Sequence, residues 1–165
     1  MKYLLINRHA KSPWNNLNVS DHDRSLNEKG VNDALEMGQR LVNKDMSFDL
    51  MVSSSAIRAL TTCQLIASKL KYPLDEIVQD RGIYEAGLSC LKKTVRSFER
   101  ENSYVAIFGH NPAFHLLAEE LSNNGIERFP TCAMMYIAFD VEDWSNCFDS
   151  SCKVLFFDYP KNTSK

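Results

Sequence analysis

The chain has 165 residues, of which 44% are hydrophobic and 24% are charged, with 19 lysines and arginines against 21 aspartates and glutamates. At this length one domain with a sizeable core is expected, and a disulfide-stapled miniprotein is excluded. The formal net charge of −2 gives no basic surplus for nucleic acid or an anionic membrane, so neither is expected as a partner.

Short apolar runs alternate along the chain with longer patterns in which apolar residues recur every three or four positions. The first kind of segment predicts a strand and the second an amphipathic helix. A polar stretch separates the last two strands, which are therefore expected to form a hairpin. Strands are expected over residues 2–7, 48–53, 77–83, 104–108, 134–139 and 154–157.

A helix is expected after each of the first four strands, and residues suited to helix starts precede three of these helices. Asn27 is expected to cap the first helix and Ser54 or Ser55 the second. Asn111, which precedes a proline, is expected to cap the fourth helix. The third helix is expected to begin near Ser89.

This order of elements predicts a single α/β domain with three layers, in which helices cover both faces of a mostly parallel central sheet. We assign this domain to residues 1–160 and expect residues 161–165 to be a frayed tail. In open sheets of this kind, ligands bind just beyond the carboxyl ends of the strands. We therefore expect the functional side chains at the carboxyl ends of the strands.

The cellular compartment is also suggested by the sequence. The first residues lack the long apolar region of a signal peptide, and no apolar run approaches the ~20 residues that a membrane-spanning helix needs. The five cysteines are odd in number and show no framework spacing, which favours free thiols in a reducing compartment. We therefore expect a cytoplasmic protein, and we expect a monomer.

Polar side chains unsuited to a core follow three of the predicted strands. Arg8 and His9 end the first strand, Arg58 lies in the first turn after the second, and His110 follows the fourth. Because these junctions meet at one edge of a parallel sheet, two guanidinium groups, two imidazoles and a helix N-terminus face the same volume. Such a set suits a tetrahedral dianion, and the sequence predicts a phosphoryl group as the ligand.

These residues carry a resemblance to a known family. The run Arg8-His9-Ala10-Lys11-Ser12 resembles the Arg-His-Gly/Ala signature of the histidine phosphatase superfamily, which also contains the phosphoglycerate mutases. The length of the chain and this run resemble those of the SixA-like branch of the superfamily, which is named for bacterial phosphohistidine phosphatases. Further segments match the superfamily in order: Trp14-Asn15, Asp23-Arg24-Ser25-Leu26 with Gly30, Ser53-Ser54-Ser55-Ala56-Ile57-Arg58-Ala59, and Gly109-His110-Asn111-Pro112.

The resemblance implies a phosphoglycerate mutase-like fold and a role for each matching residue. His9 is implied as the nucleophile, which forms a covalent phosphohistidine that water then cleaves. Attack requires a neutral imidazole, which neighbouring arginines favour, and a backbone carbonyl is expected to hold the other ring nitrogen. Arg8, Arg58 and Arg24 are expected to bind the phosphoryl oxygens, and His110 is expected to donate to the same group.

Other residues have less direct roles. Asn15 matches a phosphate-binding position in relatives, and Lys11 and Ser12 are expected at the rim of the site. Glu85 is our candidate proton donor for the leaving group, because relatives draw an acid from roughly this region; a surface carboxylate explains Glu85 equally well. A phosphohistidine substrate leaves as an imidazole, which needs less help from an acid.

Substrate and reaction class leave alternatives. The favoured substrate is a protein that carries phosphohistidine; a small phosphoester hydrolysed by a phosphomonoesterase of the same superfamily, and a non-catalytic module that binds phosphate or a phosphoprotein, both stay open. A mutase is disfavoured because mutases carry longer insertions and a glycine in place of Ala10. The spacing of Cys90 and Arg96 matches a cysteine-phosphatase loop, but that segment is predicted to be helical. No histidine cluster has the spacing of three metal ligands, so neither a metal ion nor another cofactor is expected.

Overall fold

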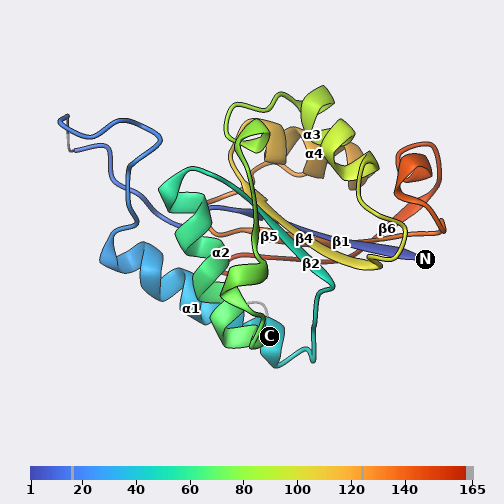
Figure 1. Ribbon diagram of the computed structural model, residues 1–165, viewed down its shortest axis with the longest axis horizontal. Coiled ribbons are helices and arrows are strands. Elements are labelled where there is room, and N and C mark those ends of the chain that lie inside the picture. The colour runs from blue at the N-terminus through green and yellow to red at the C-terminus, as the bar shows by residue number, and fades with distance from the viewer. Residues whose placement is uncertain (16, 124, 163–165) are drawn as a thin grey trace.

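The computed structural model describes residues 1–15, 17–123 and 125–162 (Figure 1). Its strands are β1 (Lys2–Arg8), β2 (Leu50–Ser54), β3 (Val78–Asp80), β4 (Tyr104–Gly109), β5 (Met134–Phe139) and β6 (Cys152–Asp158). Within these residues they form one six-stranded sheet in the order β3-β2-β4-β1-β5-β6. The first four strands in this order are parallel to one another, whereas β5 is antiparallel to both β1 and β6. The expected mostly parallel sheet and the final hairpin are confirmed.

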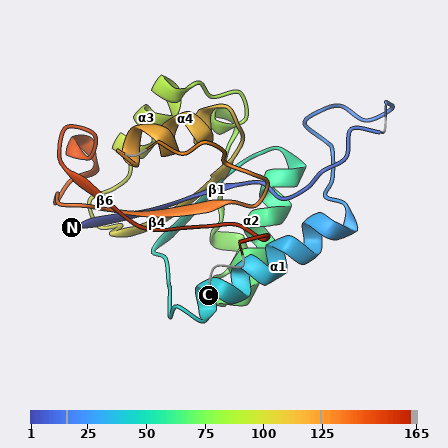
Figure 2. The same cartoon turned by 180° about the vertical axis from the view of Figure 1, so that it is seen from behind.

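Helices cover both faces of the sheet. The α-helices of the described residues are α1 (Glu28–Val42), α2 (Ile57–Leu70), α3 (Leu88–Arg96) and α4 (Ala113–Leu121). Figure 2 shows α1 and α2 on one face and α3 and α4 on the other, which confirms the three-layer arrangement. In the ranges that the structure describes, no helix is long and apolar enough to cross a membrane.

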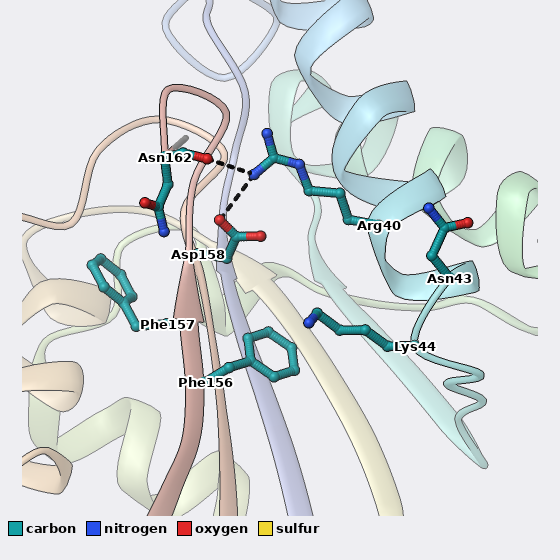
Figure 3. Close-up of a pocket in the computed structure, with 7 residues that line it drawn as sticks. All are labelled: Arg40, Asn43, Lys44, Phe156, Phe157, Asp158 and Asn162. Carbon is teal, nitrogen blue, oxygen red and sulfur yellow. Dashed lines mark hydrogen bonds and ion pairs between the residues drawn. The ribbon is translucent and has the colours of Figure 1, made fainter. Parts of the chain in front are cut away.

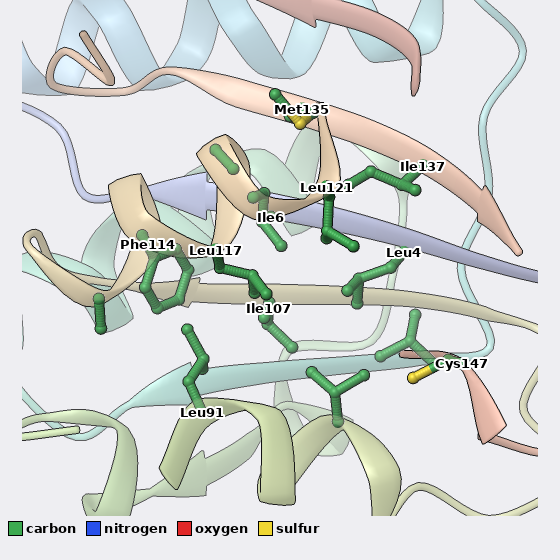
Figure 4. Packing of buried hydrophobic residues seen from close by; sticks show 14 of the residues in the cluster. Leu4, Ile6, Leu91, Ile107, Phe114, Leu117, Leu121, Met135, Ile137 and Cys147 are labelled. Carbon is green, nitrogen blue, oxygen red and sulfur yellow. The ribbon is translucent and has the colours of Figure 1, made fainter. Parts of the chain in front are cut away.

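Strand β1 shows how the sheet is buried on both sides. Leu4 and Ile6 pack on the side of α3 and α4 (Figure 4), while Leu5 between them packs on the side of α1 and α2. All three side chains are fully buried. Because successive side chains of a strand point to opposite faces, a strand covered on both sides has a continuous apolar sequence. This pattern placed β1 and β4 to within one residue.

Helix α1 begins with the expected cap, and helix α2 does not. The side-chain oxygen of Asn27 accepts a hydrogen bond from the N–H of Gly30 at 2.8 Å. The N-cap residue of α2 is Ala56, without a side-chain cap, so the expected cap by Ser54 or Ser55 is wrong. Both serine hydroxyl groups contact histidine rings instead.

The start of α4 also differs from expectation. Its N-cap residue is Pro112, and no side chain caps it. The amide nitrogen of Asn111 donates to the backbone carbonyl of Phe129 at 3.0 Å, so this side chain joins two loops. The expected cap by Asn111 is therefore wrong.

The predicted strand over residues 77–83 is shorter than expected. Strand β3 ends at Asp80, and a 3-10 turn follows over Arg81–Ile83. The carboxylate of Asp80 accepts a hydrogen bond from the N–H of Gly82 at 2.7 Å. This local bond favours a turn over continued strand pairing, which the apolar pattern alone did not reveal.

The end of β6 is fastened to α1. Arg40 donates to the carboxylate of Asp158 at 2.9 Å and to the carbonyl of Asn162 at 3.4 Å (Figure 3). A cavity of about 490 Å³ lies beside this contact, and none of the predicted site residues lines it. Of the tail predicted over residues 161–165, positions 163–165 lie outside the described residues.

Candidate active site

The carboxyl ends of β1, β2 and β4 bring four predicted residues to one edge of the sheet. Arg8 ends β1 and His9 follows it, Arg58 lies in the first turn of α2, and His110 follows β4. Nε of Arg58 lies 3.3 Å from Nε2 of His9, and the ring centroids of the two histidines are 5.2 Å apart. His9 and His110 are each 8% exposed and Arg58 is 5% exposed. We call these four residues the strand-end cluster.

The ring of His9 is held in one tautomer. Its Nδ1 lies 2.7 Å from the backbone carbonyl of Ala10, so Nδ1 carries the proton and donates it. The pKa of His9 is lowered to about 3, mainly by burial and to a smaller extent by the charges of His110, Arg58 and Arg8. The imidazole is therefore neutral near pH 7, with its lone pair on Nε2. Sequence reasoning attributed the neutral state of His9 to the arginines, whereas burial lowers the pKa of this ring more than the arginines do.

Arg58 connects the nucleophilic nitrogen to the anion-binding part of the cluster. Its Nε–H donates to Nε2 of His9, one terminal nitrogen donates to the carbonyl of Asp21 at 2.6 Å, and the other bonds to the Asp21 carboxylate at 3.1 Å. A guanidinium group has five N–H donors, so two remain for a ligand. A phosphoryl group that reacts with His9 must replace the bond from Arg58 to Nε2.

His110 supplies a buried donor. Its Nε2 lies 2.7 Å from the hydroxyl of Ser54, which also accepts from the N–H of Ala56 at 3.2 Å. The hydroxyl has one proton and two lone pairs, so it can donate to Nε2, and in that tautomer Nδ1 of His110 carries the ring proton. Burial, followed by the charge of Arg58, lowers the pKa of His110 to about 3. Nδ1 is buried without a partner in the described chain, as is Nε of Arg8.

Asp21 is a member of the site that sequence reasoning missed. One carboxylate oxygen accepts from Nε of Arg24 at 3.0 Å, and the other accepts from Arg58 and from the hydroxyl of Tyr84 at 2.6 Å. Burial would raise the pKa of Asp21, but the bond from Tyr84 and the charge of Arg58 lower it to about 2. The Asp21 carboxylate thus accepts hydrogen bonds from the arginine groups that are predicted to bind the phosphoryl group. Asp21 lies outside the segments that match the superfamily, whereas Asp23 in the same polar loop begins one of them, so no sequence signal indicated Asp21.

Tyr84, which sequence reasoning also missed, contacts the cluster. The next residue, Glu85, which was predicted as the proton donor, does not. The Tyr84 ring lies edge-on to His22 and His110, with centroids 4.9 Å and 5.7 Å away. Glu85 is exposed and forms no hydrogen bond or ion pair with any residue that the structure describes. Its assignment as proton donor stays a prediction.

The predicted rim residues lie on the loop between β1 and α1. Arg24 is 8% exposed, and it donates to the carbonyls of Ser12 and Pro13 at 3.3 Å and 3.2 Å. Its guanidinium carbon lies 3.7 Å from the ring centroid of Trp14. Arg24 therefore reaches the strand-end cluster through Asp21. The side chains of two other predicted residues, Lys11 and Asn15, are exposed on the same loop.

Steric contacts explain why two positions of the matched segments are glycine. A Cβ atom on Gly30 would lie 2.2 Å from the carbonyl oxygen of Lys11, so only glycine lets α1 rest on the backbone that follows His9. A Cβ atom on Gly109 would lie 2.4 Å from a ring carbon of Phe114. Both glycines allow the backbone of the cluster to pack closely.

The rival sites gain no support from the geometry. Cys90 and Arg96 both lie on α3, and Arg96 pairs with Asp149 at 3.1 Å, so this segment is a helix and not a phosphate-binding loop. Within the described ranges, no group of three or more histidine, cysteine, aspartate or glutamate residues is arranged to hold a metal ion.

Fold and site together define a class: a three-layer α/β protein with a phosphoglycerate mutase-like fold and a pair of buried histidines at the strand ends. A model of the histidine phosphatase superfamily, branch 1, matches residues 4–92. The chain belongs to this superfamily.

Curated relatives match the chain over part of their length. The 2,3-bisphosphoglycerate-dependent phosphoglycerate mutase of Brucella ovis is 37% identical over 84 residues, which is 50% of this chain and 41% of that protein. The chain spans about two-fifths of the length of the curated relatives it matches.

Solved structures match the fold over nearly the whole chain. A protein of Agrobacterium tumefaciens assigned as the phosphohistidine phosphatase SixA has a TM-score of 0.81 and 23% identity, covering 96% of this chain and 98% of that one. The protein histidine phosphatase SixA complexed with tungstate has a TM-score of 0.82 and 18% identity, covering 98% and 99%.

Proposed function

We propose that the chain is a phosphatase that removes the phosphoryl group from phosphohistidine in a protein, through a covalent phosphohistidine on His9. The observation that carries the proposal is the state of His9: a neutral ring whose Nδ1–H donates to the carbonyl of Ala10 and whose lone pair is on Nε2. The unpartnered donors of Arg8 and His110 support it, because they can bind phosphoryl oxygens. Tungstate, a tetrahedral oxyanion like phosphate, is bound by a SixA protein of the same fold.

In the first step, Nε2 of His9 attacks phosphorus in line. A bond forms between Nε2 and phosphorus while the bond between phosphorus and the substrate imidazole breaks, and its electron pair leaves with that imidazole. The leaving ring departs neutral when its other nitrogen carries a proton. Arg58 gives up its bond to Nε2 and, with Arg8 and His110, stabilises the charge on the phosphoryl oxygens.

In the second step, water attacks the phosphorylated His9. The new phosphorus–oxygen bond replaces the bond to Nε2, whose electron pair returns to the ring, and the water proton goes to phosphate or solvent. Because Nδ1–H keeps its bond to Ala10, the His9 ring also departs neutral. Both steps therefore break a bond to an imidazole of the same kind, and neither needs a strong acid.

The carboxyl group that contacts the cluster supports this choice of substrate. An alkoxide, the leaving group of an ordinary phosphate ester, needs a proton from a general acid. Asp21 does not supply one near neutral pH, because its pKa is about 2. An imidazole whose other nitrogen carries a proton leaves as a neutral ring without a proton from the enzyme, which favours phosphohistidine over a small phosphomonoester.

The test is to trap the intermediate. The protein is mixed with a phosphohistidine protein that carries radioactive phosphate and is quenched under alkaline conditions, which preserve phosphohistidine. We expect label on the wild type and none on His9→Ala, with phosphate release reduced by ~10³-fold or more. Folded wild-type protein that never labels and never releases phosphate would show that the chain is a binding module.

Substrate class is tested by comparing kcat/KM for phosphohistidine protein with that for alkyl and aryl phosphates. We expect phosphohistidine to be preferred, and aryl phosphates to exceed alkyl phosphates because they have better leaving groups. Equal or higher kcat/KM for an alkyl phosphate would favour a phosphomonoesterase instead.

A further inference from the structure

A basic groove begins next to the strand-end cluster. It is a cavity of about 330 Å³, to which Lys11, two residues after His9, contributes a side chain. The other charged side chains that line it are Lys29, Asp33, Arg128 and Lys161, and Tyr159 adds an aromatic surface. No role is assigned to this groove in the proposed reaction.

One wall of the groove is bonded to the cluster. It includes Arg128, and the carbonyl of the next residue, Phe129, accepts from Arg8 at 3.0 Å. Further along the same wall, the N–H of Cys132 donates to the carbonyl of His9 at 3.0 Å. The position of this wall is therefore fixed relative to the nucleophile.

A second wall of the groove is formed by the chain that follows β6. Arg40 of α1 donates to the carbonyls of Tyr159 and Pro160, each at 3.2 Å, in addition to its contacts with Asp158 and Asn162 (Figure 3). These bonds hold the wall against α1. The groove is thus a formed feature next to the site, with both walls held by hydrogen bonds.

The groove is basic although the chain is not. Four cationic side chains line it against one carboxylate, while the whole chain carries a net charge of −2. Asp33 pairs with Lys29 at 2.7 Å, so this carboxylate is already neutralised. Lys11, Arg128 and Lys161 are exposed and have no ion-pair partner in the part of the chain that the structure describes. Their charges are available to an anionic ligand.

We propose that the groove binds acidic residues that flank the phosphohistidine of the substrate protein. This inference rests on the proposed function, which places the phosphorylated side chain at His9, and it adds the character of the surrounding sequence. Small-molecule pockets are mostly apolar and enclose their ligand, whereas here the cations are exposed around an open groove. Charges of this kind select a protein partner by electrostatic complementarity.

The experiment uses two phosphohistidine peptides of equal length, with aspartate and glutamate flanks in one and asparagine and glutamine flanks in the other. We measure the ratio of kcat/KM for the acidic and neutral peptides. We expect a ratio above one for the wild type, and a roughly 2- to 30-fold lower ratio for the double variant Arg128→Gln, Lys161→Gln, because each exposed pair contributes modestly. The preference should weaken as salt is added.

The matched control is the double variant Lys93→Gln, Lys153→Gln, which removes the same charge from exposed positions outside the groove. It should keep the wild-type ratio. A wild-type ratio of one, or an equal fall in both double variants, would overturn the inference. So would a bisphosphorylated sugar that is hydrolysed with the same dependence on Arg128 and Lys161, since the groove would then serve a small molecule.

A binding measurement separates this inference from the proposed function. Stable phosphonate analogues of the two peptides are titrated with protein by fluorescence anisotropy, which needs no turnover. Tighter binding of the acidic analogue, lost in the Arg128→Gln, Lys161→Gln variant, supports the groove even if no phosphohistidine is hydrolysed. Equal binding of both analogues overturns it even if phosphohistidine is hydrolysed.

Discussion

The strand-end cluster and the loop between β1 and α1 meet at the same site but are built differently. His9 and His110 are buried at the ends of strands, and each ring has a defined hydrogen-bond partner. The loop projects from the body of the protein (Figure 1), and Trp14 on it is 75% exposed. From this loop, Asp21 enters the site and bonds to Arg58.

This difference suggests a division of roles. Groups that must hold a reacting atom within a few tenths of an ångström gain from rigid elements, because misplacement raises the barrier to reaction. Groups that set substrate affinity can lie on a long surface loop such as this one. We therefore expect changes in the cluster to act on kcat and changes in the loop to act on KM.

Among variants that keep His9, the largest effect is expected in the cluster, from Arg58→Gln. The variant loses the charge next to Nε2 of His9 and two donors for the phosphoryl group, so kcat should fall by ~10² to 10³-fold. Single-turnover kinetics with phosphohistidine protein measure this fall. Arg100→Gln, a loss of the same charge at an exposed surface pair, is the control and should leave kcat unchanged. An Arg58→Gln variant that changes KM alone would contradict the division of roles.

The buried histidines should also make stability depend on pH. Both His9 and His110 have pKa values lowered from 6.5 to about 3, so between these values the unfolded chain binds protons that the folded chain does not. The two neutral histidines cost no stability above pH 6.5. As the pH falls below 6.5, protonation of the unfolded chain lowers the free energy of unfolding. At pH 5 the loss is about 2 kcal/mol for each histidine.

Urea unfolding at pH 7 and pH 5 measures this loss. The double variant His9→Gln, His110→Gln should show a weaker fall in the free energy of unfolding, while His22→Gln should keep the wild-type fall. If the double variant were as sensitive to acid as the wild type, other groups would account for the pH dependence.

A smaller effect is expected in the loop, from Asp21→Asn. The carboxylate competes with a phosphoryl group for Arg58 and Arg24, so its neutralisation should lower KM by a factor of ~5, equivalent to about 1 kcal/mol. Asp23→Asn is the matched control, because Asp23 bonds to Ser20 and not to an arginine. A higher KM for Asp21→Asn would show that the carboxylate positions the arginines instead of competing with the substrate.

The smallest effect is expected from Glu85→Gln. Its carboxylate is exposed and the imidazole leaving group needs no strong acid, so kcat/KM for phosphohistidine protein should change by less than about 3-fold. The same variant is tested with an aryl and an alkyl phosphate. A fall of ~10²-fold for phosphohistidine would identify Glu85 as the proton donor and would place a reacting group outside the strand-end cluster.

The helix starts show where sequence rules fail. Serine and asparagine before a helix normally predict a cap, and this held for Asn27. It failed for Ser54 and Asn111, whose side chains contact His110 and the carbonyl of Phe129. Both exceptions lie at the strand ends of the candidate site, where these side chains make tertiary contacts that a local capping rule does not include.

The sequence by itself determined the three-layer α/β fold, and it predicted that Arg8, His9, Arg58 and His110 would meet at the strand ends, where the structure brings them together. Apolar periodicity and the order of elements are local properties, and they are enough to bring the ends of parallel strands together. The matched segments also identified the superfamily, which the family comparison confirmed.

Only the tertiary structure decided which side chains join that set and in what state. Asp21 bonds to Arg58 across 37 residues of chain and to Tyr84 across 63, separations over which no local sequence pattern indicates a contact. The tautomer and the low pKa of His9 depend on one carbonyl and on burial by the surrounding elements. Local sequence cannot express such properties, because desolvation and long-range hydrogen bonds arise only when the packed elements enclose the ring.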